Sequence, residues 1–174
     1  MKKALRQGSY KTLNLYYRPV VGLSSTGSPL LGRCPFPNAV TPGSDGFYDD
    51  GCMILSGTVP GGTMEEANLG VKTTREVGNW FGLFYSFHGG CLGDQVADTP
   101  AEREPSFDCA AKGTCPDQPG LDPNQQLYGL FARVSFAKAW LRDDLMLTCD
   151  SACLGEFTHG QRVRLYEVWQ LFGS

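Results

Sequence analysis

The sequence predicts an α+β protein, in which a small sheet is followed by one amphipathic helix and, at the C-terminal end, by a second. Residues 11–21 alternate polar and apolar side chains, as a half-buried strand does. Residues 52–59 form a short apolar run, which indicates a second strand, and residues 73–84 carry apolar side chains at helical spacing.

The two expected strands are separated and ended by breaker residues. The first should stop at Pro19, because proline cannot donate a ladder hydrogen bond. Residues 24–46 are rich in Gly, Pro and Ser, so we expect a long loop there. The Pro-Gly-Gly at residues 60–62 should end the second strand.

The helix expected over residues 73–84 has one apolar face, made by Val77, Trp80, Phe81 and Phe84. Residues 89–124 show little periodicity and many Pro, Gly, Asp and Cys residues, so we expect loops held by disulfides or ions.

The second helix is expected at the C-terminal end. Thr158 and Gln161 have the spacing of a capping box, in which each side chain bonds the other residue's backbone N–H. The helix after it is supported by Val163, Tyr166, Val168 and Leu171.

Composition and charge predict that the chain binds neither nucleic acid nor a membrane. The chain has 174 residues, about one domain, and a net charge of −3 without a long basic run, so we expect no nucleic-acid partner. No apolar run approaches the about 18–20 residues that span a bilayer, so we expect no membrane partner. The sequence leaves the oligomeric state open.

Seven cysteines indicate an oxidising compartment. No Cys-x-x-Cys pair occurs, which favours disulfides over a zinc-thiolate site. The basic N-terminus is not followed by the apolar stretch of about 7–15 residues that a signal peptide needs. The cysteines therefore predict an extracellular protein, whereas this chain shows no signal peptide.

The stretch "REVGNWFGLFYSFHGGC", followed by "GDQVADTP", resembles the signature of the pappalysin-like metzincin metallopeptidases, in particular their secreted fungal branch. In that family the first part reads H-E-V-G-H-W-x-G-L-x-H. The segments "ALRQGSYKTLNLYY", "DGCMILSGTVPGG", "GLDP" and "EFTHGQRVRL" resemble other family segments and occur in the family's order. The resemblance covers nearly the whole chain except a stretch near residues 134–151.

The resemblance implies a metzincin-like fold with a small, twisted, mostly parallel sheet, an active-site helix and a disulfide-rich C-terminal subdomain that ends in a helix. Residues 1–174 would form a single partial domain. Its first half, residues 1–85, would hold the sheet and active-site helix, and residues 86–174 would form a loop-rich lower half. The family's first strand and most of a long helix have no counterpart here, so we expect an N-terminally truncated domain.

The family's zinc ligands are three histidines, and the resemblance puts them at Arg75, Asn79 and Tyr85, where none is retained. Two histidines four residues apart on a helix and a third after a glycine turn would chelate one zinc ion. Glu76 occupies the general-base position and should be vestigial without a metal. Thr73 and Glu76 also match a capping box, which gives this glutamate a structural alternative.

Three functions remain open from these observations. The first is a metalloendopeptidase homologue that has lost zinc and catalysis, either as a pseudoprotease or as the product of a decaying gene. The second is an active zinc metallopeptidase with a non-standard ligand set. The third is a non-catalytic protein that binds peptides in the old substrate groove. The family's partners are peptide or protein substrates.

Two further sites follow from the resemblance. Asp94, Asp98 and Thr99 lie in a loop that holds calcium in family members, and oxygen ligands suit that ion. Residues 53–62 resemble the family's edge strand, which pairs with the substrate backbone. The alternatives are a solvated acidic turn and an ordinary edge strand.

The cysteines and the Met turn depend on how the lower half is aligned. Deleting residues 134–151 restores the family spacing and removes Cys149, which leaves six cysteines, so we interpret this stretch as an insert, a translated intron. The family's Met-turn position would then be Tyr128, or Met146 in a rival alignment. Six cysteines allow fifteen pairings; the resemblance implies Cys34–Cys52, Cys91–Cys115 and Cys109–Cys153.

Overall fold

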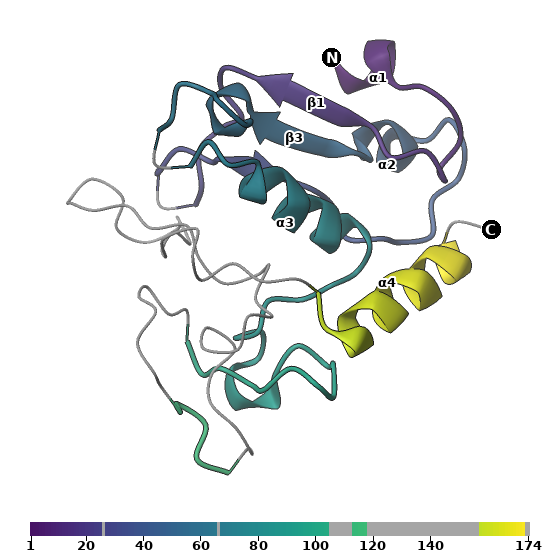
Figure 1. Cartoon of the computed structure of the whole chain (residues 1–174). Helices are drawn as coiled ribbons and strands as arrows, with labels where there is room; N and C mark the ends of the chain where they lie inside the picture. The colour runs from purple at the N-terminus through teal and green to yellow at the C-terminus, as the bar shows by residue number, and fades with distance from the viewer. Residues whose placement is uncertain (26, 66, 105–112, 118–156, 173–174) are drawn as a thin grey trace.

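The computed structural model describes residues 1–25, 27–65, 67–104, 113–117 and 157–172 (Figure 1). The predicted insert at residues 134–151, Tyr128, Met146 and the Cys109–Cys153 pair lie outside these residues. The α+β prediction is confirmed: a small sheet carries one helix across its face, and a second helix lies at the C-terminal end (Figure 1).

Within the described residues, the sheet has three short strands in the order β1-β3-β2. β1 (Leu15–Arg18) and β3 (Cys52–Leu55) are parallel, whereas β2 (Gly32–Arg33) runs antiparallel to β3. The described sheet therefore has one parallel and one antiparallel pair rather than a parallel majority. Thr58 donates its hydroxyl to the Leu55 carbonyl at 2.8 Å, in the 3₁₀ turn Ser56–Thr58 that ends β3 earlier than predicted.

The prediction of a loop over residues 24–46 was wrong in two places. β2 lies inside this segment, and α2 (Asp45–Asp49) begins at its end, where the Ser44 hydroxyl accepts from Phe47 N at 3.2 Å. A two-residue strand has no alternation to detect. It forms through its pairing with β3, and the Cys34–Cys52 disulfide links the end of β2 to the start of β3.

The helix on the sheet, α3 (Val71–Trp80), begins two residues before the predicted start and ends four residues before the predicted end. Gly82 adopts a φ of +82°, and its N–H bonds the Asn79 carbonyl at 2.9 Å, which closes the last turn. A left-handed glycine commonly ends a helix in this way. Phe84 therefore lies after the helix, where its ring stacks on His88.

The core lies between α3 and the sheet. Its buried members are Cys34, Cys52, Ile54 and Trp80, with Leu13, Val77 and Phe81 packed against them. Trp80 keeps its indole N–H satisfied by donating to Asp50 Oδ1 at 2.6 Å, and Asp50 in turn pairs with Arg6 at 2.8 Å. A buried carboxylate thus connects the helix end to the N-terminal segment, which contains α1 (Lys2–Leu5).

The C-terminal helix, α4 (His159–Phe172), confirms the predicted helix and its capping box. Thr158 N bonds Gln161 Oε1 and Gln161 N bonds Thr158 Oγ1, both at 3.0 Å. The predicted apolar face was wrong in part. Val168 packs near Gly82, but three of its members remain exposed: Val163, Tyr166 and Leu171.

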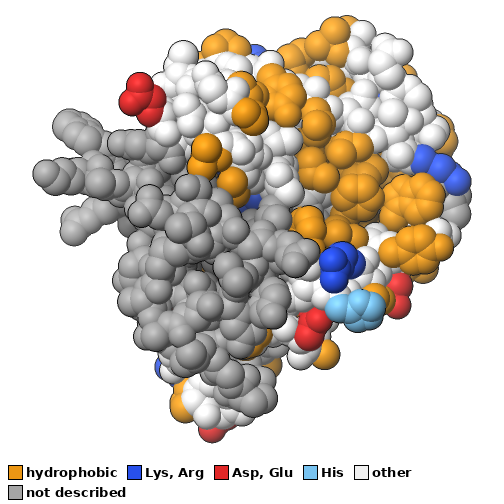
Figure 2. Space-filling model, in the orientation of Figure 1, with side chains coloured by type: hydrophobic (Ala, Val, Ile, Leu, Met, Phe, Trp, Pro, Cys, Tyr) orange, Lys and Arg blue, Asp and Glu red, His pale blue; other side chains and the backbone are white. Residues whose placement is uncertain are grey.

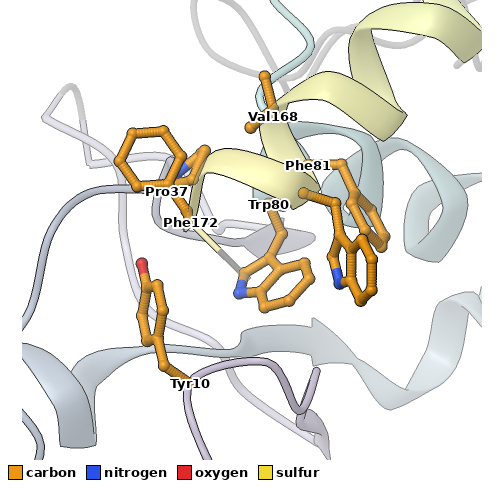
Figure 3. A pocket seen from close by; sticks show the side chains of 7 residues that line it. Tyr10, Pro37, Trp80, Phe81, Val168 and Phe172 are labelled. Atoms are coloured by element: carbon orange, nitrogen blue, oxygen red, sulfur yellow. The ribbon is translucent and has the colours of Figure 1, made fainter. Parts of the chain in front are cut away.

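Hydrophobic side chains gather on the molecular face that carries α4 (Figure 2). A cavity of about 10 Å³ lies where this helix meets the sheet layer, between Tyr10, Trp80 and Phe172 (Figure 3). None of the described helices is long and apolar enough to cross a membrane.

Gly32 allows α3 to approach β2 closely. A Cβ atom at this position would lie 2.7 Å from Glu76 Cγ and 3.0 Å from Lys72 Cε. Both side chains are buried and bonded to each other, so neither can move aside freely. The glycine is therefore required by the packing of the helix on the strand.

We expect Gly32→Ala to lower the free energy of unfolding by about 1–3 kcal/mol, the usual cost of overpacking a buried contact. Urea denaturation of both proteins measures the difference. Gly113→Ala is the matched control, because a Cβ atom added there would meet no atom of the described residues within 4 Å and the φ of this residue is not in the positive range. Equal stability of the two variants would contradict this account.

Candidate functional site

The helix α3 buries a polar row toward the rest of the protein. Lys72, Arg75, Glu76 and Asn79 are all at most 9% exposed. Burying charged groups is costly unless each has a partner, so these side chains must be explained by specific contacts. Three of the four, Arg75, Glu76 and Asn79, are at positions that the sequence analysis named as candidate site residues.

Arg75, Asn79 and Tyr85 come together in the structure. The Arg75 guanidinium carbon lies 4.5 Å from the centre of the Tyr85 ring, a cation–π contact. Asn79 Nδ2 donates to the Tyr85 hydroxyl at 3.1 Å. Helical spacing brings Arg75 and Asn79 to one face, and the turn at Gly82 returns the chain so that Tyr85 covers them.

This donor set does not fit a three-ligand zinc site. A guanidinium stays protonated and has no lone pair to donate, and its charge repels a dication. The amide nitrogen of Asn79 already faces the phenol, which leaves the amide oxygen, and that oxygen has no hydrogen-bond partner among the described residues. A single phenol oxygen and an amide oxygen do not replace three imidazoles.

Both carboxylate oxygens of Glu76 are bound, one to the backbone next to the sheet and one to a side chain of α3 itself. Its Oε2 accepts from Cys34 N at 3.1 Å, and its Oε1 pairs with Lys72 Nζ at 2.5 Å. The capping-box alternative for Glu76 was therefore wrong, because α3 begins at Val71 and Thr73 lies inside its first turn. The carboxylate instead satisfies the backbone N–H that follows β2.

Sequence reasoning missed Lys72 as the partner of Glu76. The i, i+4 spacing of an acid and a base on a helix was the available signal. Burial and, to a smaller extent, the nearby Arg75 charge lower the pKa of Lys72 to about 8, although Glu76 opposes both effects. Two cations and one carboxylate thus share the inner face of α3.

Asp98, one of the three predicted calcium ligands, anchors the start of α4. Its Oδ1 accepts from the Thr158 hydroxyl and its Oδ2 from Gly160 N, both at 2.8 Å. Burial opposes ionisation of Asp98, but these two hydrogen bonds outweigh it and lower its pKa. Its carboxylate therefore works as a second cap for the C-terminal helix.

Asp94 is buried, and its Oδ1 accepts from Val96 N at 3.0 Å. Burial raises its pKa to about 6. Thr99 is buried too, and its hydroxyl has no hydrogen-bond partner within the described part of the chain. In those residues no three His, Cys, Asp or Glu side chains form a group that could hold a metal ion. Calcium in this loop stays a prediction.

Two disulfides are present in the described part of the chain, Cys34–Cys52 and Cys91–Cys115, and both are among the pairs that the resemblance implied. The first lies next to the candidate site, where Cys52 Sγ also contacts the Glu76 carbonyl at 3.8 Å. The disulfide therefore supports the same junction of α3, β2 and β3 that the Glu76 carboxylate holds.

The expected edge strand over residues 53–62 was wrong. β3 lies between β1 and β2, so Met53 pairs on both sides, with Tyr16 and with Arg33. The edge beside α3 belongs to β2. Leu55 N bonds the Leu31 carbonyl across this pair of strands, and the next residue, Gly32, lies opposite Ile54. In an antiparallel pair, hydrogen-bonded and non-hydrogen-bonded residue pairs alternate. The N–H and C=O of Gly32 therefore point away from β3.

We expect the free energy of unfolding to rise with pH between about 8 and 10.5 through Lys72. Its pKa falls from 10.5 to about 8 on folding, so in this window the unfolded chain binds more protons than the folded one. Urea denaturation across this range, for the wild type and Lys72→Met, isolates the effect. The stability of the wild type relative to the variant should increase with pH, and a constant difference would contradict the assignment.

Comparison with known proteins agrees with these features. The chain is 42% identical over 172 residues to an extracellular metalloprotease of Verticillium alfalfae, with 97% of this chain and 54% of the relative covered. It is 42% identical over 175 residues to one of Neurospora crassa, with 99% and 53% covered. The chain spans about half the length of these curated relatives. No protein-family model matches it.

Solved structures show the same fold. Mature mirolysin of Tannerella forsythia in complex with a cleaved peptide matches with a TM-score of 0.58 at 22% identity, covering 92% of this chain and 53% of that one. Mirolysin in complex with a compound gives a TM-score of 0.60 at 24% identity, covering 92% of this chain and 53% of that one. The fold is therefore that of mirolysin, and the chain is a homologue of fungal proteins named extracellular metalloprotease.

Proposed function

We propose that this chain derives from a secreted, pappalysin-type zinc metalloendopeptidase and has lost catalytic zinc and peptide-bond hydrolysis. The observation that carries the proposal is the contact set of Arg75, Asn79 and Tyr85, which stand at the family's three ligand positions and bind one another. The names of the fungal relatives support an extracellular metalloprotease ancestry.

The charge of Arg75 is the main obstacle to zinc. Two charges at close range inside a protein interact far more strongly than in water, so a fixed guanidinium strongly opposes a dication beside it. A zinc ion would also have to displace the stacked Tyr85 ring or the Asn79 amide. Glu76 offers no help, because both of its oxygens already bind protein groups.

Elemental analysis of the purified chain tests the loss of zinc. We expect a zinc content near zero for the wild type and near one ion per chain for Arg75→His/Asn79→His/Tyr85→His. The double variant Asn79→His/Tyr85→His is the matched control, and it should stay near zero because Arg75 remains. A wild-type content near one, removable by a chelator, would overturn the proposal and favour an active enzyme with a non-standard ligand set.

The zinc-loaded triple variant should still cleave gelatin poorly. A general base must reach the metal-bound water, and Glu76 is instead bonded to Lys72 and Cys34 N. The measurement is gelatin hydrolysis by the variant after its zinc content is confirmed. Robust cleavage would show that this carboxylate leaves its partners readily and that the three ligand positions were the main deficit.

A second candidate is peptide binding without catalysis, favoured by the outer side of β2, which pairs with no other strand of the described residues. The outward N–H and C=O of Gly32 can pair with an extended peptide, and main-chain pairing needs no metal. The strand also lies against α3, as substrate-pairing edges must lie beside a cleavage site.

Amide hydrogen exchange tests this edge. Excess gelatin peptides should slow exchange of the Gly32 amide several-fold, because a backbone hydrogen bond would protect it, while the Ile54 amide in the central strand serves as the internal reference. Unchanged exchange at Gly32 under saturating peptide would rule out pairing at this edge, whatever the zinc content.

A further inference from the structure

A hollow of about 740 Å³ lies on the sheet face opposite α3. Tyr17 contacts Thr73 of α3 at 3.3 Å, and Gly32 faces Glu76, so the neighbouring residues Arg18 and Arg33 project to the other face. The hollow has the size of small-ligand sites in proteins. Its lining includes Lys2, Lys3, Arg18, Arg33, Asp49 and Met53.

The hollow collects positive charge in a chain of net charge −3. Four cationic side chains, Lys2, Lys3, Arg18 and Arg33, line it together with two carboxylates, Asp45 and Asp49. Neither arginine of the hollow forms an ion pair with a described carboxylate, whereas Arg6 and Lys72 elsewhere in the chain do. A surplus of two positive charges remains in the hollow.

The lysines of the hollow already contact other groups of the described residues, whereas the guanidinium groups of its arginines do not. Lys2 Nζ donates to the carbonyls of Asp49 and Gly51, and Lys3 Nζ lies 5.0 Å from the Tyr48 ring centre. The guanidinium groups of Arg18 and Arg33 make no hydrogen bond or aromatic contact to another described residue. Such planar groups suit carboxylate and phosphate oxygens, which they bind through two parallel hydrogen bonds.

The sheet sets the separation of the two arginines. Arg18 pairs with Leu55 and Arg33 with Met53, so they lie on opposite sides of β3. Two strand spacings across the sheet and a two-residue offset along β3 separate their backbones by roughly 12 Å, a distance that two long side chains can close from both sides. A ligand with two anionic groups can therefore contact both guanidinium groups at once.

We propose that this hollow binds a small dianion or polyanion with phosphate or carboxylate groups, held between Arg18 and Arg33. The positive charge of the hollow attracts the anionic ligand. Each arginine then binds one anionic group of the ligand through two parallel hydrogen bonds. The site is independent of the zinc-ligand positions, which lie on the other side of the sheet.

Isothermal titration of the full chain at low ionic strength, with inorganic pyrophosphate as the probe, tests the site. We expect saturable binding at one site per chain, and at least about tenfold weaker binding for Arg18→Met/Arg33→Met, because the variant loses the charge-assisted hydrogen bonds of both guanidinium groups. A parallel titration with citrate tells whether phosphate or carboxylate is preferred, and binding of either supports the proposal.

Lys11→Met/Arg103→Met is the matched control, because it removes two positive charges from exposed residues that do not line the hollow. We expect less than about a twofold change for it, as distant charges are largely screened. Arg18→Lys/Arg33→Lys keeps both positive charges but loses the two parallel N–H donors of each guanidinium group. This variant should bind the probe several-fold more weakly than the wild type does. Absence of saturable binding to both probes, or equal weakening by the Met variant and the control, would overturn the proposal.

Discussion

The two hydrogen-bonded oxygens of Glu76 hold the junction on which the rest of the structure depends. One oxygen satisfies the backbone N–H of Cys34 after β2, and the other neutralises Lys72 one turn earlier on α3. The helix thereby docks on the sheet through a carboxylate rather than through an apolar stripe alone. Removing either partner would leave a buried charge or donor unpaired, which is among the larger penalties that folding meets.

A second carboxylate fixes the other end of the same helix. Asp50 accepts from the Trp80 indole and pairs with Arg6, so the last turn of α3 is attached to the N-terminal segment. With both ends held, the rotation of α3 about its axis is set. Arg75 and Asn79 then face the returning chain, where Tyr85 meets them.

The sequence predicted the elements that have strong local signals and missed those that depend on distant partners. The cap of α4 was predictable because Thr158 and Gln161 satisfy each other within one turn. β2 was not, because a two-residue strand exists only through its pairing with β3. The role of Glu76 was misread for the same reason: its acceptor role toward Cys34 N connects residues 42 positions apart, which no local pattern reveals.

The contacts that shape the candidate site run between side chains of α3 and of the chain that returns after it. Glu76 and Asp50 orient α3, the left-handed Gly82 turns the chain, and Tyr85 packs on Arg75. In a zinc enzyme the ion itself would cross-link three such positions. A guanidinium over an aromatic ring and an amide–phenol hydrogen bond join Arg75, Asn79 and Tyr85, so protein contacts alone account for the convergence of these residues.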